Sequence, residues 1–420
     1  MWSPVFILAM TNRIAIIGGG AAGFFSAICM AEKNPHLDIS IFEKSNTVLG
    51  KVKISGGGRC NVTHHCFNPK DLIQYYPRGG KQLLGPFHTF GPTQTIEWFK
   101  KYGVSLKTED DGRMFPTSDN SATIINCFLD AVDQYGIKVK TQSGIEKLIP
   151  KENGKKGWTI QFQHGGTSDY DSIVLATGSS SHFWDMLKEL SIDIVSPVPS
   201  LFTFNCKDAR LKDLAGVSFK HVKVAVQQTK LQSEGPLLIT HWGLSGPGIL
   251  KLSSFGATHF AETKYQFKIR INFLPTYNED ELFEELNHFK SDNPKKQIIT
   301  SSCYSEIPKR YWQQLIETLQ LENKNWADAS KQDIRKLTLA LCAAEFSING
   351  KSTNKDEFVT CGGIDLNEID FKKMKVKKYE NLYAAGEVMN IDAVTGGFNF
   401  QNAWTSGFIS ASAIIDSIDN

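Results

Sequence analysis

The sequence predicts an α/β fold in which a Rossmann-like domain is interrupted by an inserted domain. A glycine-rich turn at residues 18–23 follows the apolar run 13–17, as expected where a buried parallel strand leads into a helix. A short apolar strand ending in Gly-Glu occurs near the other end, at residues 381–387. Between these blocks the pattern becomes β-rich and then helical. We therefore expect a first domain part at 1–191, an insert at 192–346 and a second domain part at 347–420.

The turn at residues 18–23 has the glycine spacing of a dinucleotide-binding site. Gly18 permits the tight turn, Gly20 lets backbone amides approach a pyrophosphate, and Gly23 allows the next helix to pack closely on the strand. The helix predicted at 21–32 begins with Ala21 and Ala22 and points its positive N-terminal end at the phosphates. The sequence therefore predicts a bound dinucleotide.

A carboxylate follows at the expected distance. The predicted strand 37–42 leads to Glu43, which lies 20 residues after Gly23, the usual spacing for an acid that binds ribose hydroxyls. A surface glutamate after an unrelated turn is the competing interpretation.

The chain then alternates helix and strand. The helical spacing of apolar residues predicts helices at 93–102 and 121–135. Strands are predicted at 137–141 and 158–163. Residues 172–178, which include Ala176, Thr177 and Gly178, are predicted as a short buried strand that runs into a glycine turn, a common pattern that gains weight beside the N-terminal turn.

The predicted insert has two parts with different sequence patterns. Residues 192–274 are β-rich, with alternating apolar and polar positions at 220–226 and 265–273. Residues 279–346 are mainly helical and charged, including predicted helices at 310–319 and 331–344.

The C-terminal block contains a second glycine-rich segment. After Gly386 and Glu387, residues 392–402 lead into a helix predicted at 403–416. Gly396 and Gly397 would let the backbone lie against a flat ring without Cβ clashes, although a glycine-rich loop capping a helix would look the same. A nicotinamide-only domain needs no such distant second block, so FAD is the preferred dinucleotide. We also expect the glycine loop 55–61 to approach the flavin half and meet Gly396 and Gly397.

Composition limits the possible functions. The 420 residues carry 46 Lys and Arg against 44 Asp and Glu, a net charge of +2, which gives no signature of nucleic-acid or membrane-surface binding. The eight cysteines form no CxxC pair, so no metal site is predicted, and scattered cysteines suit a reducing cytoplasm. No stretch approaches the roughly 20 apolar residues of a membrane helix. Met1 to Met10 is interpreted as a tail, with Met10 as a possible natural start.

Several blocks together resemble the BaiN/YhiN-type bacterial NAD(P)/FAD-dependent oxidoreductases. They are residues 50–63 (GKVKISGGGRCNVT), 112–116 (GRMFP), 240–247 (THWGLSGP), 360–364 (TCGGI) and 386–401. The resemblance covers the chain from Arg13 onward. It implies an FAD domain assembled from both chain ends and an insert with a β-barrel and helices. His64 and Asn390 depart from the family pattern, where Asn and Asp are frequent.

The motifs and the resemblance together indicate the residues that line the cofactor. They are Gly18, Gly20, Ala21, Ala22, Gly23, Glu43, Lys44, Lys51, Gly57, Gly58, Arg59, Cys60, Asn61, Ala176, Thr177, Gly178, Gly386, Glu387, Asp392, Gly396, Gly397, Phe398, Asn399 and Gln401.

Arg59 and His241 are the candidate catalytic residues. Arg59 could pair with pyrophosphate or stabilise negative charge on reduced flavin, with a structural salt bridge as the alternative. Cys60 has no partner at CxxC spacing, so a buried small side chain is expected. His241 could donate a proton above the flavin, although a packing or hydrogen-bonding histidine is the stronger expectation.

The function predicted is a cytoplasmic FAD-dependent oxidoreductase acting on a small organic substrate, with NAD(P)H as a possible donor. Without a second GxGxxG unit, a nicotinamide would have to enter through the face covered by the insert. The alternatives are an oxidase using oxygen, a flavoprotein that modifies RNA, which near-neutral charge disfavours, and a non-catalytic flavin-binding module. The substrate and the oligomeric state stay open.

Overall fold

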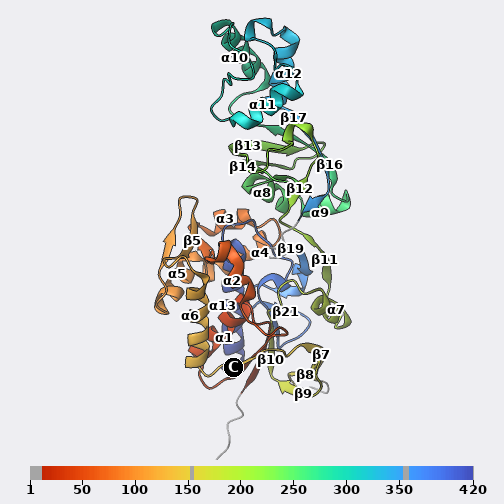
Figure 1. Ribbon diagram of the computed structural model, residues 1–420. Coiled ribbons are helices and arrows are strands. Elements are labelled where there is room, and N and C mark those ends of the chain that lie inside the picture. The colour runs from red at the N-terminus through yellow and green to blue at the C-terminus, as the bar shows by residue number, and fades with distance from the viewer. Residues whose placement is uncertain (1–11, 152–155, 353–358, 420) are drawn as a thin grey trace, which may run out of the picture. The chain divides into compact units, whose positions relative to one another are not determined.

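In the computed structural model, which describes residues 12–151, 156–352 and 359–419, the chain forms two compact units (Figure 1). Unit 1 comprises Met1–Pro197 and Val359–Asn420, and unit 2 is Val198–Phe358. The segment Met1 to Met10, interpreted above as a tail, lies outside the described residues. Unit 2 extends past the predicted insert end at 346, because a strand that begins at Ala344 pairs inside it.

Unit 1 is built on a seven-stranded sheet of order β20-β21-β22-β10-β1-β2-β6. Strands β22, β10, β1, β2 and β6 are parallel, and β21 and β20, the last two strands on one side of the sheet, are antiparallel. Their bounds are β1 Arg13–Ile17, β2 Asp38–Phe42, β6 Lys138–Lys140, β10 Ser172–Leu175, β20 Ile369–Asp370, β21 Lys375–Val376 and β22 Leu382–Ala384. The Rossmann-like α/β fold predicted from the sequence is confirmed.

The helices of unit 1 pack against this sheet, as α1 and α13 do, or against one another. They are α1 Ala21–Lys33, α2 Gly50–Gly58, α3 Pro69–Leu72, α4 Gly80–Thr89, α5 Pro92–Lys101, α6 Ser121–Gln134, α7 Ser181–Glu189 and α13 Phe398–Asp419, with 3-10 turns η1 Ile73–Tyr75, η4 Leu366–Glu368 and η5 Gly386–Val388. The helices predicted at 21–32, 93–102 and 121–135 are therefore present, with ends shifted by one residue.

Helices α1 and α13 pack side by side although they come from opposite ends of the chain (Figure 1). Gly407 of α13 lies so close that an added Cβ would be 3.2 Å from the carbonyl oxygen of Ala22. The rings of Phe25 and Trp404 are 5.2 Å apart, and both side chains are fully buried. The apolar faces of the first and last helices thus share one core.

Three small sheets complete unit 1. They are β3-β5-β4 (Thr63–His64, Arg113–Pro116 and Leu106–Thr108), β7-β8-β9 (Ile145–Pro150, Trp158–Phe162 and Thr167–Tyr170) and the pair β11 (Ile194–Pro199) and β19 (Thr360–Ile364). Strands β11 and β19 are the segments by which the chain leaves unit 1 and returns to it. They run in opposite directions, because Asp365 N–H donates to the Asp193 carbonyl while Gly362 lies against Pro197.

Unit 2 contains a second seven-stranded sheet, of order β17-β16-β13-β14-β15-β12-β18. The bounds are β12 Thr203–Asn205, β13 Ser218–Val226, β14 Gln232–Ile239, β15 Gly243–Ser245, β16 Gln266–Asn272, β17 Ala344–Asn349 and β18 Lys351–Ser352. Strands β17 and β18 are consecutive in the sequence but lie at opposite edges of this sheet, where they pair with β16 and β12. The closed barrel that the resemblance implies stays a prediction.

Helices occur in both parts of unit 2. They are α8 Pro247–Phe255, α9 Ala257–Glu262, α10 Glu279–Asp292, α11 Lys309–Thr318 and α12 Lys331–Cys342, with 3-10 turns η2 Ala209–Leu211 and η3 Trp326–Asp328. The predicted β-rich part missed α8 and α9. Pro247 fits the first turn of α8, where no intrahelical N–H bond is lost, and Ile249 and Leu252 are buried one turn apart. None of the described helices is long and apolar enough to cross a membrane.

Candidate cofactor site

The carboxyl ends of four adjacent parallel strands, β22, β10, β1 and β2, meet at one edge of the unit 1 sheet. The segments that follow them are hydrogen bonded in sequence across that edge. Gly18 N–H donates to the Phe42 carbonyl, Ala176 N–H to the Ile17 carbonyl and Ala385 N–H to the Leu175 carbonyl, over 2.8–2.9 Å. This edge of an open α/β sheet is where such folds bind ligands.

The glycine turn has the geometry that its sequence predicts. Gly18 has φ +117°, and an added Cβ would lie 2.2 Å from the Ala176 carbonyl oxygen. An added Cβ on Gly23 would lie 2.1 Å from the Gly18 carbonyl oxygen. Only glycine fits at these two positions, because backbone atoms of the protein already fill the space.

Gly20 differs from Gly18 and Gly23, because a Cβ added there would meet no protein atom within 4 Å. Gly20 is also the N-cap of α1, where no side chain caps the helix and no acidic residue lies in its first turn. Unpaired N–H groups and a positive helix end therefore border free space, which fits a pyrophosphate.

Glu43 is held beside this turn. Its Oε2 accepts a hydrogen bond from Gly19 N–H over 2.9 Å, and its Oε1 accepts from the N–H and hydroxyl of Ser45. The carboxylate is thus fixed at the end of β2, next to the phosphate turn. This position suits a ribose hydroxyl contact, and the contact itself stays a prediction.

The second glycine loop is the end of α2, which is regular helix only up to Ile54. Gly56 and Gly57 have left-handed backbones, with φ of +59° and +68°. Gly58 also has a positive φ, of +84°, and added Cβ atoms on Gly57 and Gly58 would meet no protein atom. Like Gly20, these two glycines leave free space that a large cofactor can fill.

The two ends of the chain meet at this loop. An added Cβ on Gly397 would lie 2.5 Å from the Thr63 carbonyl oxygen. With the Asn61 amide oriented to satisfy its neighbours, its oxygen accepts from Gly397 N–H over 2.9 Å. We expected the loop 55–61 to contact Gly396 and Gly397, and the contact between Asn61 and Gly397 is confirmed.

Other predicted residues are brought together across the edge. Lys51 donates to Glu387 over 2.5 Å, and the Glu387 carboxylate lies 3.8 Å from where a Cβ on Gly178 would be. An added Cβ on Gly386 would lie 3.0 Å from Ala22 Cβ. The turns after β1, β10 and β22 and the start of α2 therefore surround one site. These residues, with Ala21, Lys44 and Thr177, stay predicted cofactor contacts.

A further group of predicted residues has partners within the protein. Gln401 is fully buried, and its amide oxygen accepts from the hydroxyls of Thr63 and Thr95, over 2.6 and 3.0 Å. Asn399 makes two hydrogen bonds to the Ala393 backbone. Asp392 is fully buried and forms a two-point ion pair with Arg78. These side chains hold the loop before α13 in shape.

Phe398 lies in an aromatic stack at the start of α13. Its ring stacks on Tyr75, with centroids 4.2 Å apart, and on His64, with centroids 4.6 Å apart. Burial lowers the pKa of His64, and its Nε2 lies 3.1 Å from the Asp111 carbonyl oxygen. A neutral His64 is therefore favoured near neutral pH. Sequence patterns gave no sign that Tyr75 belongs here.

Arg59 takes part in an ion network. It donates to Glu109 over 2.5 Å, lies 3.5 Å from Asp119, and stacks over the Phe115 ring at 3.9 Å. The hydrogen bond to Glu109 raises the pKa of Arg59 further. These contacts connect the glycine loop to the β4–β5 hairpin and support the structural salt bridge considered above.

Cys60 is fully buried, and burial raises the pKa of its thiol to about 12. A protonated, inaccessible thiol is a poor nucleophile, which supports a packing role for Cys60. His241 lies in unit 2, exposed in the turn between β14 and β15. Its suggested place above the flavin stays a prediction.

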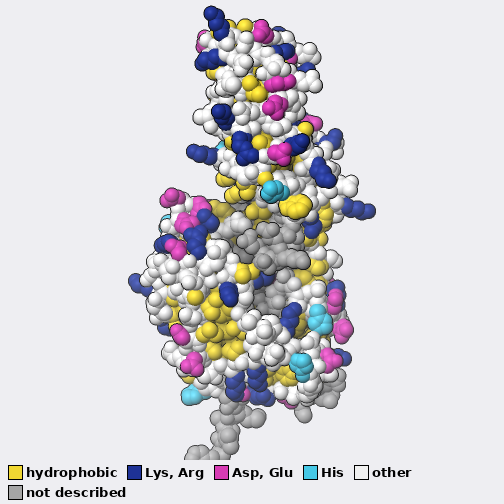
Figure 2. Space-filling model, viewed as in Figure 1, with side chains coloured by type: hydrophobic (Ala, Val, Ile, Leu, Met, Phe, Trp, Pro, Cys, Tyr) yellow, Lys and Arg dark blue, Asp and Glu magenta, His cyan; other side chains and the backbone are white. Residues whose placement is uncertain are grey.

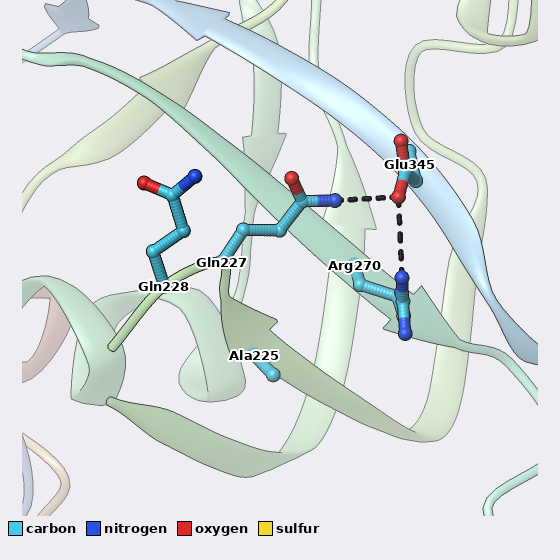
Figure 3. A pocket seen from close by; sticks show the side chains of 5 residues that line it. All are labelled: Ala225, Gln227, Gln228, Arg270 and Glu345. Carbon is cyan, nitrogen blue, oxygen red and sulfur yellow. Dashed lines mark hydrogen bonds and ion pairs between the residues drawn. The ribbon is translucent and has the colours of Figure 1, made fainter. Parts of the chain in front are cut away.

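A hollow of about 330 Å³ occurs elsewhere, on the sheet of unit 2 (Figure 3). Glu345 lies in it and accepts hydrogen bonds from Gln227 and Arg270, over 2.6 and 3.2 Å (Figure 3). The hydrogen bond from Arg270 is the main cause of the lowered pKa of Glu345. These side chains therefore satisfy one another's hydrogen-bonding groups.

Comparison with known proteins gives one family. The model of the HI0933-like protein Rossmann domain matches residues 12–413. A ribosomal RNA dihydrouridine synthase of Haemophilus influenzae is 26% identical over 95% of this chain and 97% of its own length. A 3-dehydro-bile acid delta(4,6)-reductase of Clostridium scindens is 25% identical over 96% and 98%.

Solved structures show the same fold. A 3-ketosteroid-delta4-(5alpha)-dehydrogenase from Rhodococcus jostii RHA1 aligns with a TM-score of 0.51 and 11% identity, over 97% of this chain and 99% of that one. A 3-ketosteroid delta1-dehydrogenase from Sterolibacterium denitrificans aligns with the same TM-score and identity, over 97% and 100%.

The open space at Gly20 leads to the first prediction. Gly20→Ala should leave the fold intact but weaken FAD binding about tenfold or more, since the new methyl group occupies the space for phosphate. Gly85→Ala is the matched control, because Gly85 in α4 is exposed and also has no protein atom within reach of an added Cβ. FAD fluorescence titration gives the affinity, and thermal melting of the apoprotein checks the fold. Equal FAD affinity in both variants would place the phosphate elsewhere.

The buried ion pair gives a second prediction. Asp392→Asn should lower the free energy of unfolding by about 3 kcal/mol, because the Arg78 charge loses its buried counter-charge. Glu380→Gln removes an exposed ion pair with Lys156 and should cost at most about 0.5 kcal/mol. Urea unfolding is measured with and without FAD. A loss seen only with FAD would show that Asp392 acts on the cofactor instead.

Proposed function

Because this chain belongs to the family of the HI0933-like protein Rossmann domain and is an FAD-dependent oxidoreductase, we propose that it reduces a carbon–carbon double bond conjugated to a carbonyl group. The family membership confirms the resemblance noted in the sequence, and FAD is the cofactor. NAD(P)H is the proposed electron donor.

The observation behind this proposal is the chemistry shared by the relatives. Dihydrouridine is uridine whose C5–C6 double bond, conjugated to the C4 carbonyl, has been reduced. A delta(4,6)-reductase of a 3-dehydro-bile acid acts on double bonds conjugated to the 3-oxo group. The substrates differ greatly in size, yet both reductions add a hydride and a proton across an electron-poor double bond. Because both relatives align over nearly the whole of this chain, we propose their common reaction for it.

FAD, when bound, supplies the hydride-transfer chemistry. The residues of this chain bind and orient it. The N-terminus of α1 and Gly20, which border free space, would hold the pyrophosphate. Glu43 would bind a ribose, and the open glycines Gly57 and Gly58 would leave room for the flavin half. Overall, the reaction consumes NAD(P)H and a proton and yields NAD(P)⁺ and the saturated carbonyl compound. We also propose His241 as the donor of the proton that this reduction consumes.

The test is anaerobic reduction of the purified holoprotein, followed by addition of possible acceptors. Oxidised flavin absorbs at about 450 nm, and NADH or NADPH should bleach this band by reducing the flavin. Cyclohexenone, a 3-oxo-Δ4 steroid or uridine-containing RNA should restore the band, with the saturated product identified by mass spectrometry. Cyclohexanone, which lacks the double bond, is the matched control and should have no effect.

Two outcomes would overturn the proposal. Restoration by oxygen alone, with no conjugated substrate consumed, would indicate an oxidase. A flavin that no donor bleaches would indicate a non-catalytic binding module.

A further inference from the structure

Four small polar side chains lie on one face of the unit 2 sheet, across the neighbouring strands β18, β12 and β15. Thr203 of β12 pairs with Ser352 of β18, and its hydroxyl donates to the hydroxyl of Ser245 in β15 over 2.9 Å. Asn205 lies two residues after Thr203 and therefore on the same face, because side chains alternate along a strand. All four are partly exposed, and we call them the polar row.

The opposite face of these strands belongs to the core of unit 2. Phe204, which alternates with Thr203 and Asn205, is fully buried. Lys351 pairs with Phe204 and so lies on that face too, where its Nζ is 4.9 Å from the centre of the Tyr265 ring. Figure 2 shows charged side chains at many points of the visible face of unit 2. The polar row, in contrast, contains no charged residue.

The hydrogen bonds within the polar row leave donor groups over. Thr203 donates to Ser245 Oγ, so the Ser245 O–H can donate elsewhere. The Ser352 hydroxyl donates to Asn205 Oδ1 over 2.7 Å, which leaves both N–H groups of the Asn205 amide. Within the described part of the chain, no acceptor binds these donors of Asn205 and Ser245. The polar row therefore presents donors to an acceptor atom of a ligand.

The strands on either side of Asn205 place glycines next to it. Gly243 pairs with Asn205 from β15. On the other side, Asn205 N–H donates to the Gly350 carbonyl over 3.0 Å, and an added Cβ on Gly350 would lie 3.5 Å from Asn205 Nδ2. At these two positions no side chain covers the Asn205 amide, so a ligand oxygen can reach its N–H groups.

An apolar side chain borders the polar row. Leu238 of β14 pairs with Ser245, lies on the same face and is 37% exposed. A ligand that fits both features has an apolar part and an uncharged oxygen that accepts hydrogen bonds. A carboxylate fits less well, since Arg or Lys usually binds that group. A ketone conjugated to a double bond has the composition that this surface favours.

We propose that Asn205 and Ser245 donate hydrogen bonds to the carbonyl oxygen of the conjugated substrate, with Leu238 against its apolar part. This deepens the proposed function and rests on it. In that reaction a hydride from reduced FAD adds to the carbon β to the carbonyl group, the electron pair of the double bond moves toward the carbonyl oxygen, and a proton then adds to the α carbon. Donors aimed at the oxygen stabilise the negative charge that develops there.

The first test follows reoxidation of the reduced, FAD-loaded protein by cyclohexenone in a stopped-flow instrument. Ser245→Ala and Asn205→Asp should each lower the rate constant about 100-fold, the usual loss when one such donor is removed. Aspartate keeps an oxygen that accepts from Ser352 but has no N–H group, so a merely structural role of Asn205 would survive this change. Ser245→Thr retains a hydroxyl and should keep most of the rate.

Two controls separate loss of the carbonyl contact from general damage. Ser291→Ala is the matched variant, because Ser291 is an exposed serine of α10 whose hydroxyl donates to the Asn287 carbonyl of its own helix. Ferricyanide, which has no carbonyl group, is the control acceptor and should reoxidise every variant at the wild-type rate. An equal loss with ferricyanide and with cyclohexenone would overturn the proposal in favour of a structural role.

A second test reads the hydrogen bonds without turnover. Infrared difference spectra are recorded for cyclohexenone, labelled with ¹³C at the carbonyl carbon, bound to the oxidised holoprotein. A donated hydrogen bond weakens the C=O bond and lowers its stretching frequency. The frequency should therefore be lowest in the wild type and should rise in Ser245→Ala and in Asn205→Asp.

The two tests separate this inference from the proposed function. Unchanged reoxidation rates in both variants, or a carbonyl band that is the same in wild type and variants, overturns the carbonyl contact, even where the wild type reduces cyclohexenone. A band that depends on both Asn205 and Ser245, in a protein that reduces no conjugated substrate, supports the contact and leaves the proposed reaction as the part that fails.

Discussion

The parallel pairing of β10 with β22 is the contact on which the rest of the structure depends. These strands come from opposite sides of unit 2 in the sequence, yet Val174 pairs with Tyr383 in the centre of the sheet of unit 1. Because parallel strands end at the same edge, this pairing brings the Gly386-Glu387 turn beside the turns after β1 and β10. Without it, Lys51 and Glu387 could not meet. Such a distant pairing costs loop-closure entropy, which the shared core of α1 and α13 helps to offset.

The glycines of the site fall into two physical kinds. At Gly18, Gly23 and Gly397 the missing Cβ is replaced by carbonyl oxygens of the protein itself, so glycine is needed for the fold. At Gly20 the missing Cβ borders free space and the backbone φ of −96° suits any residue, so the fold alone does not explain the glycine. Gly57 also borders free space, but its left-handed backbone by itself favours glycine. The second kind is the better guide to where a ligand lies, and sequence spacing alone cannot tell the two kinds apart.

The parts that the sequence could predict depend on local steric rules. The turn after β1, the helix α1 and the position of Glu43 follow from strand length, glycine placement and spacing, and the structure has all three. Partners across the fold could not be predicted, because no local pattern specifies them. Arg78 as the partner of Asp392 and Thr95 as a partner of Gln401 are of this type.

The antiparallel pairing of β11 with β19 has a consequence for how the protein can be taken apart. The chain leaves and re-enters unit 1 on neighbouring strands, as the two arms of a β-hairpin do. A turn of about two to five residues spans such a gap. Residues 198–358 are thus the equivalent of an enlarged hairpin loop, and replacing them with a short turn would leave every strand of the main sheet of unit 1 in the chain.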